Sequence, residues 1–384
     1  MTFLTRLADE PFRIFFPLAV VSGLLGVSMW PLYFFEVIPF YPGMNHSRVM
    51  AFGFFGGFMM GFLWTALPRL LSAQGLRIWE LIVLLILYVS LVAAHFLGAT
   101  VIGEGVVLLW LVSMIGFALS RVIRGSDLPP PGFVLMLFGV LCAGGGTVVS
   151  MLDARVELDS EWLVLRQLLE FQGFLLLPVT GVGGFILPRI LGLPERQSFD
   201  EGRWPSRGWW IQFGSATLVG LVVIGTFFLE VRGLFVWAYS LRFLAVVGYL
   251  TWQVPWHHAT VKGTFIWGLQ VGLGSFVAGI LLIACFPEWR LPFLHLALGI
   301  GLVMITIVVA SRVVLGHSDR LVEMEGRQRW FAWVFGLIFL GVTSRMIGDF
   351  IPKILISHYN YGALFWGVGL IFWAYKLLRR RRTV

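Results

Sequence analysis

Histidine is the scarce reactive side chain of this 384-residue sequence, which contains seven. A neutral imidazole binds copper, iron or haem iron through one ring nitrogen. The histidines fall near the two ends of long apolar runs: His46, His95, His295 and His358 at one end, and His257, His258 and His317 at the other. We single out His46 and His295, because each opens a long run at the same end. A histidine at a membrane interface costs little, so an interfacial role without function stays open for the others.

His295 and His317 cannot bind the same metal ion. They flank one apolar run and are 22 residues apart in the sequence. At 1.5 Å per residue a helix would separate them by about 33 Å. His317 is therefore a candidate ligand at a different depth in the membrane. Either the protein has two metal sites, or only one of the two groups of histidines is functional.

Two pairs of ionisable residues lie inside apolar runs, at a spacing of i, i+4. They are Arg166 with Glu170, and Arg345 with Asp349. Buried charges are costly in a membrane and face the protein interior or a water-filled cavity. One interpretation is that each pair fixes helix packing. The other is that an arginine holds an anionic ligand such as a haem propionate, because guanidinium matches carboxylate in a fork.

Methionines and glycines in one run, residues 44–61, leave alternatives open. The methionine thioether is a soft ligand for Cu(I), but methionine is also ordinary apolar filler. Gly53, Gly57 and Gly61 form overlapping small-xxx-small motifs. Such motifs let helices approach closely, and the same openness would suit a flat macrocycle.

The elements that must position these residues are transmembrane helices. Apolar residues make up 58% of the chain, charged residues 12%, and the mean hydropathy is +0.88. A soluble domain would carry about a quarter charged residues. Because backbone groups in lipid must be satisfied internally, and strand-like alternation is absent, the runs predict helices. We expect twelve spans, near 13–35, 48–70, 80–98, 101–120, 131–151, 161–188, 208–229, 233–253, 261–285, 291–314, 330–351 and 360–378.

The fold class predicted is an all-α polytopic membrane protein. No long polar segment lies outside the spans, so residues 1–384 form one transmembrane domain. The polar run 193–207 is a candidate connector between two six-helix halves, 1–192 and 208–384. The two cysteines lie in separate apolar runs, which argues against a structural disulfide or a cysteine-based metal site.

Lysine and arginine predict the orientation. One side of the membrane collects 20 of the 28 basic residues and the other collects 5. The positive-inside rule then places both termini in the cytoplasm. The net charge of +8 is explained by a cytoplasmic rim beside anionic lipid and requires no nucleic acid.

Three stretches resemble the NnrS family of membrane proteins. His46-Ser-Arg-Val-Met-Ala-Phe-Gly-Phe54, continuing into GFLWTALPRLL, is similar to the family's H-x-H-E-M-x-F-G-F and GFLLTAxPN. The stretch 183–189, GGFILPR, is similar to its G-G-R-x-I-P-x-F. The run from His295 to His317 reproduces its histidine, its helix and its ending, T/S-R-x-x-L-G-H-x-x-R, with Arg312 and Arg320 in place.

The sequence departs from the family pattern in its first motif. Arg48 stands where the family has a second histidine, and Val49 where it has a glutamate. A further family histidine aligns near Ile266 and Trp267. A guanidinium cation cannot ligate a metal, but it can bind a propionate or another anion.

The resemblance implies a bacterial inner-membrane protein that binds haem and copper and responds to nitric oxide. It marks His46, His295 and His317 as metal ligands, with Arg48 and Arg312 as further cofactor-binding residues. Without a histidine at position 48 the outer site lacks a full copper set, so haem is favoured there. The alternative is a transporter or cofactor-handling permease whose buried ion pairs line a pathway. A haem absorbance band distinguishes the two. The turnover, redox partner and oligomeric state are left open.

Overall fold

Twelve helices of the computed structural model are long and apolar enough to cross a membrane. The structure describes residues 3–197, 202–258 and 261–378; arginines 379–382 of the predicted basic tail lie outside this part. The spans are Phe12–Phe34, Gly43–Leu70, Ile78–Phe96, Thr100–Arg124, Phe133–Asp153, Ser160–Leu191, Arg207–Val231, Phe235–Gln253, Thr264–Cys285, Pro287–Gly316, Arg329–Phe350 and Pro352–Leu378. No strand occurs among the described residues, which confirms the all-α prediction.

Nine of the spans are single α-helices or begin with a short 3₁₀ turn. They are α2 (Phe12–Phe34), α5 (Ile78–Phe96), α6 (Thr100–Arg124), α7 (Phe133–Asp153), α10 (Arg207–Val231), α11 (Phe235–Gln253), α12 (Thr264–Cys285), α15 (Arg329–Phe350), and η7 (Pro352–Ile354) with α16 (Leu355–Leu378). Short elements outside the spans are α1 (Phe3–Asp9), η3 (Trp256–His258) and η6 (Leu321–Met324).

The remaining three spans each contain a π-helical turn within the membrane. They are α3 (Gly43–Arg48), η1 (Val49–Phe55) and α4 (Gly56–Leu70); α8 (Ser160–Gln167), η2 (Leu168–Gly173) and α9 (Phe174–Leu191); and η4 (Pro287–Trp289), α13 (Arg290–His295), η5 (Leu296–Leu302) and α14 (Val303–Gly316). π turns are rare and occur frequently at functional sites. Functional residues are therefore expected near these three turns.

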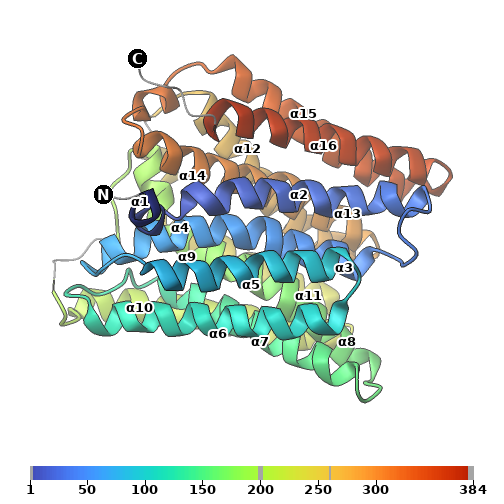
Figure 1. Ribbon diagram of the computed structural model, residues 1–384, viewed down its shortest axis with the longest axis horizontal. Coiled ribbons are helices and arrows are strands. Elements are labelled where there is room, and N and C mark those ends of the chain that lie inside the picture. Colours follow the sequence, from blue (N-terminus) through green and yellow to red (C-terminus); the bar gives the residue numbers. More distant parts are fainter. Residues whose placement is uncertain (1–2, 198–201, 259–260, 379–384) are drawn as a thin grey trace.

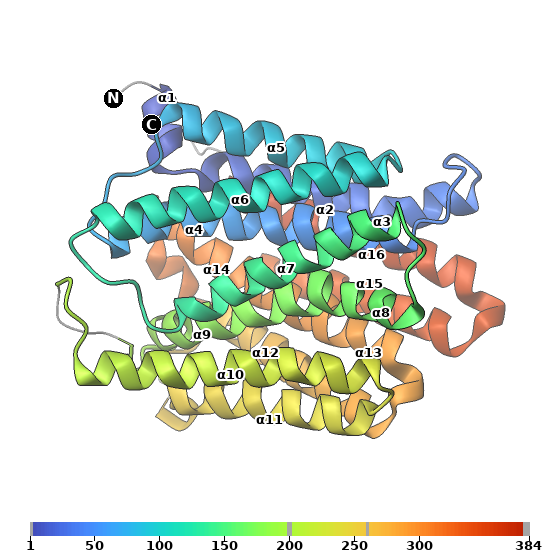
Figure 2. The same ribbon diagram turned by 90° about the horizontal axis from the view of Figure 1, so that it is seen from below.

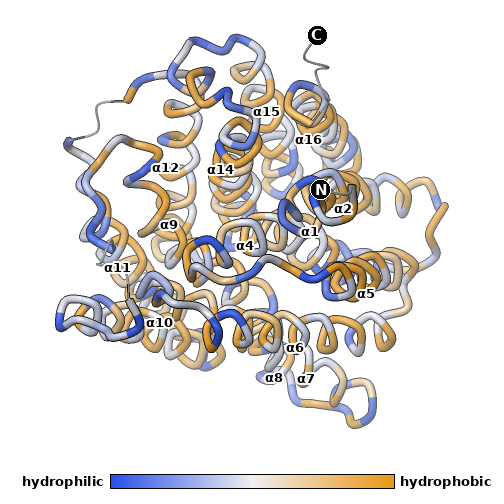
Figure 3. The backbone as a smooth tube through the Cα atoms, turned by 60° about the vertical axis from the view of Figure 1, so that its left-hand side comes forward, coloured by the Kyte–Doolittle hydropathy of each residue, from blue (hydrophilic) through white to orange (hydrophobic). Residues whose placement is uncertain are grey.

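The second and sixth spans are the most deeply buried of the described spans. Their most apolar windows are 83% buried, followed by α7 at 61% and the tenth span at 56%, against 28% for α6. Figure 3 looks obliquely along the bundle and shows α4 and α14 among the surrounding helices. Large apolar side chains such as Leu109, Val112 and Leu218 are exposed on the outer helices, where they suit contact with lipid.

Both ends of the described chain lie at one end of the bundle. α1 and the end of α16 lie together at the left in Figure 1, and we call this the terminal end. The opposite end, the far end, carries the start of α3 and α8 at the right of the same view. Figure 2 shows α10 and α11 along one flank, with α5 and α6 along the other.

Local signals explain where several spans begin and end. Ser206 caps α10, because its hydroxyl accepts a hydrogen bond from the Trp209 backbone N–H. Gly192 ends α9 in the left-handed conformation, with φ 66°, which glycine adopts without steric cost. The second span begins at Gly43 rather than 48, and the twelfth begins at Pro352 rather than 360. His46 and His358 thus lie within helices.

Candidate metal centre

His46 projects from α3 at the far end of the bundle. Its ring atom Nδ1 lies 2.8 Å from the carbonyl oxygen of Gly26 in α2. Trp30, one turn further along α2, packs edge-on to the imidazole, with the ring centroids 6.1 Å apart. The second span therefore supplies the histidine, and the first span fixes its orientation.

His295 is the last residue of α13, immediately before the π turn η5. Its Nδ1 lies 2.9 Å from the carbonyl oxygen of Leu291, one turn earlier. His295 lies close enough to His46 for their charges to interact. The fold thus brings together two histidines that are 249 positions apart in the sequence.

Both imidazoles are held in the same tautomer. A carbonyl oxygen only accepts hydrogen bonds, so Nδ1 of each ring carries the hydrogen and Nε2 carries the lone pair. No hydrogen bond within the described part of the chain engages Nε2 of either ring. Metal-ligating histidines are typically fixed this way, with the second ring nitrogen donating to a carbonyl. His46 and His295 can therefore each offer one ligand to a metal.

An ion pair and two aromatic rings border the histidines. Arg345 Nη1 lies 2.5 Å from Asp349 Oδ1 within α15, the pair expected from the i, i+4 spacing. The Tyr359 hydroxyl donates to the same oxygen at 2.7 Å. The Arg345 guanidinium lies 3.4 Å from the Tyr359 ring centroid, and its charge reaches both imidazoles. We call this group, with Trp30, His46 and His295, the two-histidine cluster.

Arg48 does not belong to the two-histidine cluster. Its side chain is 2% exposed and forms ion pairs with Glu104 (2.6 Å) and Glu170 (3.2 Å). It also donates to the Ser150 hydroxyl at 2.8 Å. We call these four residues the Arg48 cluster. Arg48 was expected to bind an anionic group of the cofactor; in the structure its guanidinium faces two carboxylates of the protein, Glu104 and Glu170.

The expected pair of Arg166 and Glu170 is wrong. Arg166 instead pairs with Asp153 at 3.0 Å, and Glu170 pairs with Arg48. The reason is local: the π turn η2 begins at Leu168, between the two residues. A π turn has i→i+5 hydrogen bonds, so side chains four positions apart no longer lie one above the other.

His317 lies at the terminal end and has both ring nitrogens occupied. Nδ1 lies 2.8 Å from the Val313 carbonyl oxygen, and Nε2 accepts a hydrogen bond from Arg69 at 2.6 Å. Burial lowers the pKa of His317, and the Arg69 charge acts in the same direction. A neutral ring held in this way has no lone pair left for a metal. Arg312, its neighbour on α14, faces the charges of Arg189 and Glu195.

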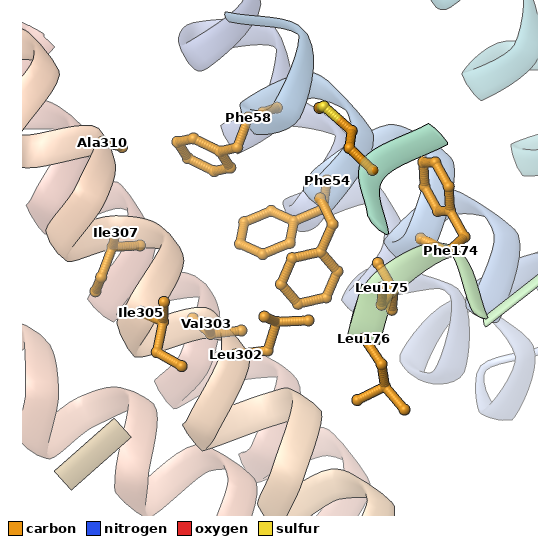
Figure 4. Close-up of a cluster of buried hydrophobic side chains, with 14 of the residues drawn as sticks. Phe54, Phe58, Phe174, Leu175, Leu176, Leu302, Val303, Ile305, Ile307 and Ala310 are labelled. Carbon is orange, nitrogen blue, oxygen red and sulfur yellow. The ribbon is translucent and has the colours of Figure 1, made fainter. Parts of the chain in front are cut away.

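An apolar cavity of about 110 Å³ lies deeper in the bundle. It is lined by residues of α4, α9 and α14, including Phe58, Phe174 and Ala310. Figure 4 shows these three side chains in the surrounding apolar cluster. Its lining begins at Leu302, seven residues beyond His295, or roughly 10 Å along the helix. The second and tenth spans thus carry the histidines at one end and the cavity wall further in.

Four residues of the two clusters were not predicted from the sequence. Glu104 is a lone carboxylate in an apolar run and is fully buried, so its isolation was a usable signal. Trp30, Ser150 and Tyr359 gave no such signal, because aromatic and hydroxyl residues are common at membrane interfaces. Among the described residues, no three histidine, cysteine or acidic side chains are grouped as a metal would need.

Comparison with known families gives one match. A family model described as NnrS protein matches residues 6–381, nearly the whole chain. No curated protein matches the sequence.

Proposed function

The chain belongs to the NnrS family, and we propose that it binds a metal cofactor, haem or copper, between His46 and His295 and handles nitric oxide or a related nitrosative species. It is a multi-pass membrane protein with twelve candidate spans. We place it in the bacterial inner membrane, with its termini in the cytoplasm.

One observation carries the proposal. His46 and His295 come from two of the three spans that contain a π turn, lie near enough for their charges to interact, and each have Nδ1 at a carbonyl oxygen and a hydrogen-free Nε2. His317 and His358 also direct Nδ1 at a carbonyl oxygen, so the tautomer alone is not distinctive. What sets His46 and His295 apart is that they come from different spans and lie beside the same guanidinium, that of Arg345. Such an arrangement supports ligation of a metal centre.

The residues fit haem iron better than a protein-bound copper ion. His46 and His295 would hold haem iron through Nε2, whereas a copper ion would need a further ligand, and Arg48 faces elsewhere. The Arg345 guanidinium and the Tyr359 ring could border a macrocycle, although Asp349 already neutralises that charge. Met50 packs against Gly26 and lies four residues beyond His46 in the same span. When bound, haem iron or copper would supply the centre that coordinates nitric oxide.

The chain itself would orient this centre and control access to it. Gly26 and Leu291 hold the imidazoles, Trp30 packs against Tyr359, and the Arg345–Asp349 pair sets the local charge. The apolar cavity between α4, α9 and α14 would suit a small uncharged molecule such as nitric oxide.

The test is the absorption spectrum and metal content of the purified protein. We expect a haem Soret band in the wild type and its loss in His46→Ala and in His295→Ala. His317→Ala should retain it, because His317 lies at the other end of the bundle.

His358→Ala is the matched control and should keep the Soret band. His358 also lies at the far end, and its Nδ1 also faces a carbonyl oxygen one turn earlier, that of Ile354. Copper without a Soret band, lost in the same two variants, would assign the site to copper. Unchanged haem and copper in both His46→Ala and His295→Ala would refute the proposal. Absence of pigment and metal from the wild type would favour the permease alternative.

A further inference from the structure

The Arg48 cluster is a second buried polar site, separate from the two-histidine cluster. It joins four spans at the far end: Arg48 from α3, Glu104 from α6, Ser150 from α7 and Glu170 from η2. Glu104 and Glu170 are fully buried, and the Arg48 side chain is 2% exposed. The balance of positive and negative charges in this buried site decides whether its carboxyl groups are protonated.

The cluster has one guanidinium for two carboxylates. Other buried carboxylates of the described chain have an arginine each: Glu80 has Arg121, and Asp349 has Arg345. Glu230 has two, Arg242 and Arg290. The charge of Arg166 also reaches both carboxylates, but Arg166 pairs with Asp153 at 3.0 Å, so the group with Asp153 included still has one more acidic than basic side chain.

A net negative charge in this position is strongly unfavourable. Transfer of an unpaired carboxylate from water to a low-dielectric interior costs several kcal/mol or more, and a buried group neutralises itself instead. With both carboxylates ionised, the Arg48 cluster would hold a net charge of about −1, so binding one proton removes the penalty.

The hydrogen bonds indicate which oxygen can carry the proton. Both oxygens of Glu170 accept from Arg48. Glu104 Oε1 pairs with Arg48 and accepts from Ser150, whereas Glu104 Oε2 is buried with no partner. A proton on Oε2 therefore displaces none of the existing contacts.

His95 is a further buried polar side chain beside this site. It is fully buried in α5, and neither ring nitrogen has a hydrogen-bond partner. Its ring lies against Gly103, where an added Cβ would be 2.6 Å from Cε1, and it feels the charge of Arg48. Thr147 of α7 is a further buried hydroxyl without a partner.

We propose that the Arg48 cluster is a proton-binding site, in which Glu104 carries one proton on Oε2 at neutral pH. The facing charged and titratable groups are Arg48, His95, Glu170, Arg166 and Asp153. The site is independent of whether the two-histidine cluster binds a metal.

The experiment is infrared spectroscopy of the purified full-length protein at pH 7, in H₂O and in D₂O. A protonated carboxyl gives a C=O band that shifts on deuteration. We expect one carboxyl equivalent of this band to be lost in Glu104→Gln and also in Glu170→Gln, because either change leaves one carboxylate for Arg48. Arg48→Gln should gain one equivalent if it folds, and Glu195→Gln, in an exposed pair, should match the wild type.

Thermal stability locates the proton. Glutamine resembles a neutral glutamic acid, so Glu104→Gln should melt close to the wild type. Glu170→Gln should melt lower, because Glu104 must then ionise to balance Arg48 while its buried Oε2 has no hydrogen-bond donor. The reverse order would place the proton on Glu170 and overturn the assignment to Glu104. No protonated carboxyl band in the wild type, or a band unchanged in both variants, would overturn the proton-binding site itself.

Discussion

At the scale of single residues, the backbone acceptor decides what a histidine can do. His46, His295 and His317 each direct Nδ1 at a carbonyl oxygen. Only His317 has a guanidinium on Nε2, supplied by Arg69. His46 and His295 therefore each keep a free lone pair on Nε2, whereas His317 does not. A lone pair that accepts a hydrogen bond is not available to a metal.

The Arg345–Asp349 pair gives a prediction at this scale. Asp349→Asn should lower the free energy of unfolding by about 3–5 kcal/mol, since it leaves the guanidinium of a buried pair without its counter-ion. The side chains are 12% and 8% exposed. The measurement is thermal unfolding of the purified protein in detergent.

Arg320 and Glu323 provide the control for this change. Their side chains are 26% and 35% exposed, so Glu323→Gln should cost only about 0–1 kcal/mol. If both substitutions lowered the unfolding temperature equally, the Arg345–Asp349 pair would not be desolvated.

At the scale of elements, the π turns coincide with the candidate residues. η1 begins directly after Arg48, η2 contains Glu170, and η5 begins directly after His295. A π turn accommodates an extra residue and changes which side chains lie above one another. The close approach of α2 to η1 depends on Gly26, where an added Cβ would lie 2.7 Å from Met50 Sδ.

A larger residue at Gly26 tests this close approach of α2 to η1. Gly26→Leu should force α2 and η1 apart, displace the carbonyl that holds His46, and destabilise the protein by about 1–3 kcal/mol through overpacking. We expect reduced cofactor content and a lower unfolding temperature.

Gly116→Leu is the matched substitution. Gly116 also lies in a membrane-spanning helix, α6, but an added Cβ there meets no atom within 4 Å. It should leave both quantities unchanged. Wild-type cofactor content in Gly26→Leu would show that the Gly26 carbonyl does not position His46.

At the scale of the whole molecule, the even number of spans places α1 and the end of α16 at one end of the bundle (Figure 1). That end also carries Arg69, Arg189 and Arg320, consistent with the basic bias of the sequence. The Arg48 cluster and the two-histidine cluster lie at the opposite end. If the basic end faces the cytoplasm, both clusters face the outside.

Topology reporters test this orientation. Fusions placed after Val384 and within the connection 193–207 should both report a cytoplasmic location. A fusion in the loop between α2 and α3, residues 35–42, is the control and should report the outside. An external location of either of the first two would reverse the assignment.

The twelve spans, the all-α class and the family were determined by the sequence, because hydropathy and span length are properties of contiguous residues. The Arg345–Asp349 pair was also predictable, since α15 is a regular α-helix in which i and i+4 side chains meet. The same spacing failed for Arg166 and Glu170, because η2 begins between them and contains Glu170. No signal in the local sequence predicted the π turn η2.

The partners of the candidate residues were decided only by the tertiary structure. Glu170, which neutralises Arg48, is 122 positions further along the chain, and the carbonyl that orients His46 belongs to another helix. A helix exposes several faces, and which one meets a neighbour depends on the packing of all twelve spans together. The residue types at the site could therefore be read from the sequence, whereas their pairing, their free lone pairs and the excess buried carboxylate required the fold.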